Sequence, residues 1–331
     1  MNIKGIFYGS LFTVAWVNSF GQSNEQYPPI PRDTTYSVYT VYNQTKKNYP
    51  FVSIAKDSLP DGVIAHRDIM YTTLPNTPYG NRDLHLDLFR PGKPGKYPAL
   101  IMIHGGGWRS GTKRMQVPIA EMIAARGFVT VAVEYQLSLE AKYPAAVYNI
   151  KAAIRWVRAN AEKYNIDADH IAISGCSAGG QLASLIGMTN GISKFEGNQG
   201  NSDYSSAVQA IIDIDGVLDF MAPASLNLNR KPNSPDVEWL GGTFTEKPEI
   251  WKEASSIFWA NEKSVPMLFI NSGFSRFHAG QDELIGMMKE WNIYTEVHKF
   301  DVKVHPFWLL HPWVDSTVDY MVNFMNKVLR K

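Results

Sequence analysis

Short apolar runs alternate with stretches of helical periodicity along most of the chain. Some of the strand-like runs are continuously apolar, as a buried strand requires. The eight predicted strands are Val63–Thr73, Asp83–Phe89, Ala99–Ile103, Phe128–Glu134, Ile171–Ser174, Val208–Ile214, Pro266–Ile270 and Tyr294–Phe300. Helices are expected from near Met115, over Ala145–Lys163, after Ser177, over Gln281–Trp291 and from Val314. This alternation predicts an α/β fold in which helices cover both faces of a mostly parallel central sheet.

Two segments break the alternation. Residues 22–62 are rich in Tyr, Pro, Thr and Asn and show no helical period, which predicts an N-terminal extended arm. Residues from about 221 to 263 follow the sixth predicted strand and contain scattered prolines, tryptophans and the pair Gly241–Gly242. They are predicted to form an insertion packed over the sheet edge. Residues 63–331 are then expected to form a single domain that includes this insertion.

Composition agrees with a globular protein that has a sizeable core. Of the 331 residues, 45% are hydrophobic and 19% are charged. The 32 basic and 31 acidic residues leave a formal charge of +1. Because the two signs balance and no run of like charges occurs, neither a nucleic acid nor an anionic membrane surface is expected as a partner.

Residues 1–21 differ from the rest of the chain. Lys4 is followed by an apolar stretch from Gly5 to Val17, and the small residues Ser19 and Gly21 offer a cleavage site. The pattern predicts a signal peptide, and hence a secreted or periplasmic protein; a buried N-terminal strand and a membrane anchor are the alternatives. The stretch is short for a spanning helix and no other apolar run approaches that length, so no membrane span is expected.

The segment Gly175-Cys176-Ser177-Ala178-Gly179 has the G-x-S-x-G pattern, in which a serine stands on a strained turn between a strand and a helix. Ser177 is therefore the candidate nucleophile, although a glycine-rich turn with a bystander serine would look the same. Cys176 is the one cysteine of the chain, so no internal disulfide is possible. It is interpreted as a small buried neighbour of the turn rather than as a catalytic thiol.

A second glycine-rich turn, His104-Gly105-Gly106-Gly107-Trp108, follows the apolar run that ends at Ile103. Its glycines free the backbone to direct N–H groups at a developing oxyanion. The predicted oxyanion donors are the N–H groups of Gly106, Gly107 and Ala178. His104 is then interpreted as a hydrogen-bonded structural residue, and Trp108 as a wall of the acyl pocket or a core residue.

A serine nucleophile of this kind needs a histidine base, which is expected late in the chain. His305 lies in the loop directly after the last predicted strand and is the first choice, with His311, just before the closing helix, as the alternative. His278 comes one strand too early, and His298 falls inside a predicted strand.

These motifs resemble those of the α/β-hydrolase superfamily, specifically its hormone-sensitive-lipase-like and feruloyl or acetylxylan esterase-like branch. The matching pieces are His104–Trp108, Tyr143–Pro144 with the helix that follows, Gly175–Gly180 and His305–Phe307. The resemblance spans roughly residues 63–330 and implies an α/β-hydrolase fold and ester hydrolysis without a cofactor. Several secreted members of the family deacylate plant polysaccharides.

The chain departs from the family where the catalytic acid is concerned. The family usually places an aspartate in the loop after the penultimate strand, but residues 271–278 contain no acid, and Ser275 stands near the expected position. Asp215, at the end of the preceding strand, is the first candidate, because some relatives of the fold use that place. Asp282 and Asp301 follow in that order, and an absent acid is the remaining possibility. The alternative, purely structural interpretation of Asp215 is a residue that forms the turn before Gly216.

Two further sequence features bear on the chemistry. Gln136 stands where the family usually carries an arginine after a tyrosine, which puts the support given by that arginine in doubt. No His, Cys, Asp or Glu spacing matches a zinc site, so no metal is expected.

The sequence thus predicts a secreted serine esterase that acts on acetyl or feruloyl esters of plant-type polysaccharides or oligosaccharides. Trp108 and Trp308 are candidate substrate-binding residues, and Trp239, Trp251, Trp259 and Trp313 are further aromatics able to stack on sugars. The alternatives are a general carboxylesterase or lipase-like hydrolase, an exopeptidase, and a saccharide-binding pseudoenzyme without turnover.

Overall fold

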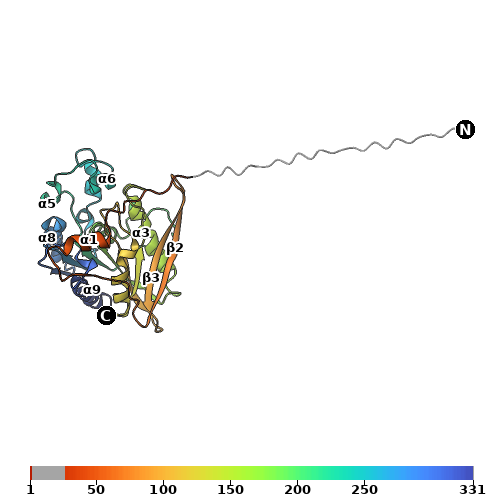
Figure 1. The fold of residues 1–331 in the computed structure, drawn as a ribbon, viewed down its shortest axis with the longest axis horizontal. Helices are drawn as coiled ribbons and strands as arrows, with labels where there is room; N and C mark the ends of the chain where they lie inside the picture. The colour runs from red at the N-terminus through yellow and green to blue at the C-terminus, as the bar shows by residue number, and fades with distance from the viewer. Residues whose placement is uncertain (2–26, 331) are drawn as a thin grey trace.

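A computed structural model describes Met1 and residues 27–330, so the predicted signal peptide lies, Met1 apart, outside the described residues. An eight-stranded sheet has the order β2-β3-β5-β4-β6-β7-β8-β9 (Figure 1). Its strands are β2 (Val63–Thr77), β3 (Gly80–Pro91), β4 (Tyr97–Ile103), β5 (Val129–Val133), β6 (Ile166–Cys176), β7 (Ala210–Ile214), β8 (Met267–Asn271) and β9 (Thr295–Lys299). The pairs β2–β3 and β3–β5 are antiparallel, and the strands from β5 to β9 run parallel. The predicted mostly parallel sheet is therefore confirmed.

Helices cover both faces of the sheet, as the alternating pattern predicts. One hydrophobic cluster joins the sheet to α3 (Ala145–Ala159), α4 (Ala178–Met188) and α8 (Gln281–Glu290). A second cluster joins the other face to α2 (Val117–Ala124) and α9 (Trp313–Leu329). Along β4 the side chains alternate between the two clusters, because successive residues of a strand point to opposite faces.

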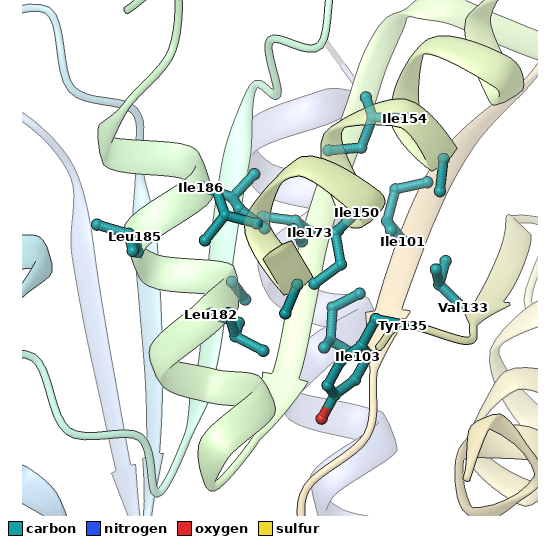
Figure 2. Packing of buried hydrophobic residues seen from close by; sticks show 14 of the residues in the cluster. Ile101, Ile103, Val133, Tyr135, Ile150, Ile154, Ile173, Leu182, Leu185 and Ile186 are labelled. Carbon is teal, nitrogen blue, oxygen red and sulfur yellow. The ribbon is translucent and has the colours of Figure 1, made fainter. Parts of the chain in front are cut away.

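The packing of α3 and α4 fixes the centre of the sheet. Figure 2 shows Ile150 and Ile154 of α3 and Leu182 and Ile186 of α4 beside the inner strands, all in one buried cluster. Each is fully buried, and burying an isoleucine or leucine side chain contributes about 1.5–3 kcal/mol. Because α4 begins directly after Ser177, this packing also holds the turn that carries the serine.

The insertion between β7 and β8 forms three short α-helices and, after them, a 3-10 helix over Ser256–Trp259. The α-helices are α5 (Pro223–Leu226), α6 (Pro235–Leu240) and α7 (Pro248–Glu253), and each begins with a proline. A proline is tolerated at the first helical position because its missing N–H would have no partner there. Figure 1 shows α5 and α6 beyond one end of the sheet, on the side away from β2 and β3.

The N-terminal arm is not wholly extended, so this part of the prediction is wrong. Residues Val38–Thr45 form α1, whose start is stabilised by a reciprocal cap: Ser37 Oγ accepts from the Thr40 N–H and Thr40 Oγ1 accepts from the Ser37 N–H. Most residues of this helix are β-branched or aromatic, and such residues are weak helix formers, which is why the sequence analysis misses it. Farther along, β1 (Ser53–Ile54) pairs with β10 (Leu310–His311), which ties the arm to the segment after His305.

The carboxyl ends of the parallel strands bring the candidate chemistry together. The loops after β4, β6, β7 and β9 carry the glycine-rich turn, Ser177, Asp215 and His305, respectively. Ligands of open α/β sheets bind at this edge. No helix among the described residues combines the length and apolar character needed to cross a bilayer.

Candidate active site

Ser177 occupies the turn between β6 and α4 in a conformation that side chains rarely adopt. Its backbone has φ 57° and ψ −121°, and such a strained residue costs about 1–3 kcal/mol. The turn is tight enough that a Cβ at Gly175 would collide with the Gly179 carbonyl. The Ser177 N–H donates to the Ile214 carbonyl at 2.8 Å, which anchors the strained residue to β7. The serine is thereby held at the edge of the sheet.

His305 accepts a hydrogen bond from the serine. The Ser177 hydroxyl donates to Nε2 of His305 at 2.7 Å, and the Nδ1–H of His305 donates to Asp215 Oδ2 at 2.8 Å. This proton arrangement follows from the partners of the two ring nitrogens. Burial lowers the pKa of His305 and outweighs the opposing effect of the Asp215 carboxylate. The imidazole is therefore neutral near pH 7, which is the state that can accept a proton.

Asp215 is fully buried at the end of β7 and has three donors. Besides His305, the N–H of Ser272 donates to its Oδ1 at 2.7 Å and His278 Nε2 donates to the same oxygen at 3.3 Å. Burial raises the pKa of Asp215, but the hydrogen bonds from His278, His305 and Ser272 outweigh it, so the net shift is downward. The carboxylate is consequently ionised near pH 7, where the imidazole is neutral.

The other candidate acids lie elsewhere. Asp282 is exposed in the first turn of α8, and Asp301 is exposed just beyond β9. Within residues 27–330, the acid that reaches His305 is Asp215. The alternative base His311 is occupied by a different carboxylate, since its Nδ1 lies 2.7 Å from Asp315 Oδ2 on the surface.

The glycine-rich turn after β4 lies against the serine turn. A Cβ on Gly105 would lie 2.6 Å from the Cys176 carbonyl oxygen, so the two turns touch through their backbones. Gly106 has φ 123°, and a Cβ there would collide with the Ser110 carbonyl. Gly106, Gly107, Ser177 and Ala178 line the same cavity.

His104 is a buried structural residue. Its ring stacks on Tyr135 with centroids 4.5 Å apart, and its Nδ1–H donates to the Gly105 carbonyl at 2.8 Å. Burial lowers the pKa of His104 to about 4, so the ring is neutral and its hydrogen bond stays in place at ordinary pH. It stabilises the turn that carries Gly106 and Gly107.

The cavity in front of Ser177 has a volume of about 460 Å³. Trp108 and Phe220 form its apolar wall. Trp108 stacks on Trp239 with centroids 4.7 Å apart, and its Nε1–H donates to Gln181 Oε1 at 3.0 Å. These contacts hold the indole in one orientation at the cavity surface.

The expectation that Trp308 stacks on a sugar is wrong for this structure. Its side chain is 1% exposed and contacts the His305 ring edge-on, with centroids 5.2 Å apart. It does not line the cavity in front of Ser177. Its indole packs among apolar core residues, where it contacts the His305 ring and not the cavity.

The loop after β8 supports the histidine in a way that the sequence analysis missed. Phe277 stacks face to face on His305, with centroids 3.5 Å apart and planes 8° apart. Arg276 lies over Phe277 and lines the cavity. The run Arg276-Phe277-His278 places three large side chains in a short loop. Three consecutive large side chains in a loop could have indicated that this loop packs against the site. The sequence analysis considered the loop only for its missing aspartate.

A buried network includes Gln136, the residue that stands for the family's usual arginine. Its amide contacts Glu140 at 3.3 Å and Asn149 at 3.3 Å. Glu140 is also contacted by a guanidinium: Arg82 of β3 donates to Glu140 at 2.9 Å and to Glu134 at 2.7 Å. Arg82 therefore provides a positive charge beside Glu140. No cluster of side chains suited to a metal ion occurs in the part of the chain that the structure describes.

Comparison with known proteins relates this geometry to a family. The BD-FAE family model matches residues 86–289, from β3 to α8. Esterase LipC of Mycobacterium tuberculosis is 29% identical over 216 residues, which is 63% of this chain and 52% of LipC. The chain spans about a third to a half of the length of this and other curated relatives that it matches.

Solved structures share the fold. A truncated carbohydrate esterase from gut microbiota has a TM-score of 0.71 at 23% identity, over 83% of this chain and 100% of the other. A bifunctional GH43-CE protein of Bacteroides eggerthii has a TM-score of 0.67 at 25% identity, over 82% of this chain and 39% of the other. With well over half of its length matched by the family model and its sheet shared with these enzymes, the chain belongs to the BD-FAE family of α/β-hydrolases.

Proposed function

We propose that this protein is a serine esterase that hydrolyses acyl esters on plant-type saccharides. The observation that carries the proposal is the unbroken hydrogen-bond chain from Ser177 through His305 to the buried Asp215. A serine hydroxyl is a weak nucleophile, and a base in hydrogen-bond contact activates it. A third group that orients the base completes the arrangement used for acyl transfer.

In the proposed reaction, Ser177 Oγ attacks the ester carbonyl carbon while His305 Nε2 takes the hydroxyl proton. The carbonyl oxygen becomes an oxyanion, which the N–H groups of Gly106, Gly107 and Ala178 are proposed to stabilise. The bond to the alcohol oxygen then breaks, and His305 returns the proton to that oxygen. Water attacks the acyl-enzyme with His305 again as base, which releases the carboxylic acid and restores the serine.

Asp215 is assigned the role of orienting residue. By accepting from Nδ1–H, it fixes the tautomer of His305 that leaves Nε2 free for the serine proton, and it stabilises the imidazolium that forms. Ser272 and His278 hold the carboxylate from its other oxygen. Phe277 is proposed to keep the imidazole plane in place through the stacked contact.

The saccharide part of the proposal is supported by three lines of reasoning. The named structural neighbours include a carbohydrate esterase, and Trp108, which is largely buried, lines the cavity with part of its indole. Aromatic faces of this kind bind the apolar face of a sugar ring. The signal peptide predicted from residues 1–21 would bring the enzyme to polymers outside the cytoplasm.

The alternatives differ in what they require. A general carboxylesterase is favoured by the name of the relative LipC and by the apolar wall of Trp108 and Phe220. An exopeptidase needs a group for the substrate's α-amino end, but the two carboxylates that line the cavity already have partners: Asp236 accepts from Arg230 and Asp215 accepts from His305. The lack of an acid in the loop after β8 would favour a pseudoenzyme, because the histidine would have no orienting carboxylate. The contact between Asp215 and His305 provides such a carboxylate from another loop.

A substrate screen tests the proposal. The wild-type protein is expected to hydrolyse p-nitrophenyl acetate and to release acid from at least one of acetylated xylan, acetylated pectin and methyl ferulate. Turnover of p-nitrophenyl esters of increasing chain length, with no release from any saccharide ester, would favour the general carboxylesterase. Folded protein that turns over none of these esters would contradict the esterase proposal.

Replacing Asp215 with Asn should lower kcat by about 10⁴-fold on p-nitrophenyl acetate, because an amide at this position no longer stabilises the imidazolium or its required tautomer. The matched control is Asp282→Asn, which removes a carboxylate of the same kind from an exposed helix start. It should keep kcat within about twofold. Steady-state kinetics on both purified variants decide between the two acids, and a more severe loss in Asp282→Asn would refute the assignment of Asp215.

A further inference from the structure

The cavity in front of Ser177 contains a guanidinium that has no polar partner. Five of its lining residues are aspartate, arginine or histidine: Asp215, Arg230, Asp236, Arg276 and His305. Within residues 27–330, the structure gives the Arg276 guanidinium neither a hydrogen bond nor an ion pair, and its contact is the face of Phe277, 4.1 Å from Cζ to the ring centroid. Arg276 is exposed at the rim of this cavity, so water satisfies its guanidinium in the free protein and its N–H groups are available to an anionic ligand that enters the cavity.

The other charges of the cavity are already occupied. Arg230 donates to Asp236 Oδ2 at 2.6 Å and to the Ser225 carbonyl at 2.7 Å. The second oxygen of Asp236 accepts from the Val237 N–H at 2.9 Å. Asp215 is held by the two histidines and by Ser272. None of these carboxylates is left over for Arg276.

The contact with Phe277 positions the Arg276 guanidinium so that it can bind a planar anion. His305 covers one face of the Phe277 ring and the guanidinium lies over the ring, which gives a layered order of arginine, phenylalanine and histidine. A guanidinium held over an aromatic ring through its Cζ face leaves its N–H groups free to donate to a ligand. Two parallel N–H groups match the two oxygens of a carboxylate.

The position of this stack indicates which part of the substrate Arg276 faces. In the proposed reaction, His305 gives its proton to the leaving alcohol, so the alcohol part of the ester lies on the histidine side of Ser177. The glycine turn at Gly106 and Gly107 binds the carbonyl oxygen instead. Because Arg276 adjoins the histidine through Phe277, it belongs to the alcohol side, where the saccharide lies.

We propose that Arg276 binds a carboxylate on the saccharide, and that the preferred substrates are acylated oligosaccharides that carry a uronic acid. This inference rests on the proposed function, because it assigns a specificity residue to the same reaction. The guanidinium contributes to substrate binding and takes no part in the bond-making steps. Its removal should therefore affect acidic saccharides far more than neutral esters. Because the Arg276 charge also lowers the pKa of His305, the variants are compared well above pH 6.5, where the imidazole is neutral.

The test compares two acetylated xylo-oligosaccharides of equal length, one neutral and one bearing a glucuronic acid branch. The wild type should show a higher kcat/KM on the acidic substrate. Arg276→Gln should lower that value about tenfold, mainly through KM, because a charge-assisted hydrogen bond is lost. Values on the neutral oligosaccharide and on p-nitrophenyl acetate should stay within about twofold. The matched control Arg126→Gln removes an exposed cation at the end of α2 and should leave all three values unchanged.

The outcomes separate this inference from the proposed function. Equal kcat/KM on both oligosaccharides for the wild type, or an equal loss on all substrates in Arg276→Gln, would overturn the carboxylate site while leaving the esterase intact. Failure of the wild type on p-nitrophenyl acetate would instead contradict the esterase. Calorimetry with Ser177→Ala and the unacetylated oligosaccharides gives a readout without turnover. Tighter binding of the acidic sugar that weakens with added salt is expected, and indifference to the uronic acid would again overturn the site.

Discussion

Ser177→Ala is expected to lower kcat on p-nitrophenyl acetate by at least about a thousandfold, because the hydroxyl that donates to His305 is lost. The fold should persist, since the backbone hydrogen bond from Ser177 to Ile214 does not involve the side chain. Steady-state kinetics and circular dichroism on the purified variant measure both expectations.

The matched control for this experiment is Ser174→Ala. Ser174 is a buried serine on the same strand, and its hydroxyl contacts the Ile101 carbonyl at 3.4 Å, away from the cavity. This variant should retain most of the wild-type kcat at a small cost in stability. Near wild-type turnover by folded Ser177→Ala would remove the serine from the mechanism.

His305→Ala should approach the serine variant in severity, because without the imidazole nothing takes the Ser177 proton or returns it to the leaving alcohol. His311→Ala is the control: its side chain pairs with Asp315 at the surface, and its strand contact with Ser53 is made by the backbone. The control should lose at most a few-fold in kcat. If His311→Ala were the more damaging change, the assignment of the base would be wrong.

The pH profile reports on the same histidine. Only neutral His305 accepts the proton, so kcat/KM should fall as the pH drops through the pKa of the free enzyme's imidazole. Burial holds that pKa below the ordinary value of 6.5, which places the acidic limb below pH 6.5. Asp215 opposes this shift, so the limb should move lower still in Asp215→Asn. A limb above pH 6.5 in the wild type would show that burial does not dominate the pKa of His305.

The sequence predicted the fold well where one physical signal dominated. The continuously apolar runs, such as Ala99–Ile103, form strands because both faces of a parallel sheet are buried. The helices over Ala145–Ala159 and Gln281–Glu290 were predicted from their helical periodicity. Ser177 and the glycines of the other turn were recognisable because close backbone contacts tolerate little besides glycine there.

Features that depend on packing between distant segments could not be predicted in this way. Helix α1 owes its start to the cap between Ser37 and Thr40, and its β-branched and aromatic residues do not indicate a helix. The burial of Trp308 depends on neighbours from several elements, so its identity as tryptophan suggested a surface role that it does not have. Likewise, the choice between Asp215 and Asp282 depended on where two loops lie relative to the histidine, which spacing along the chain does not determine.

The position of Asp215 has a consequence for how this enzyme can change. The carboxylate that orients His305 comes from the end of β7, whereas Arg276 and Phe277 come from the loop after β8. Residue 276 can therefore be exchanged without moving the acid. If Arg276 sets substrate preference as proposed, new specificities can be selected in a library at residue 276, provided that Ser272, Phe277 and His278 of the same loop, which contact Asp215 or His305, are kept.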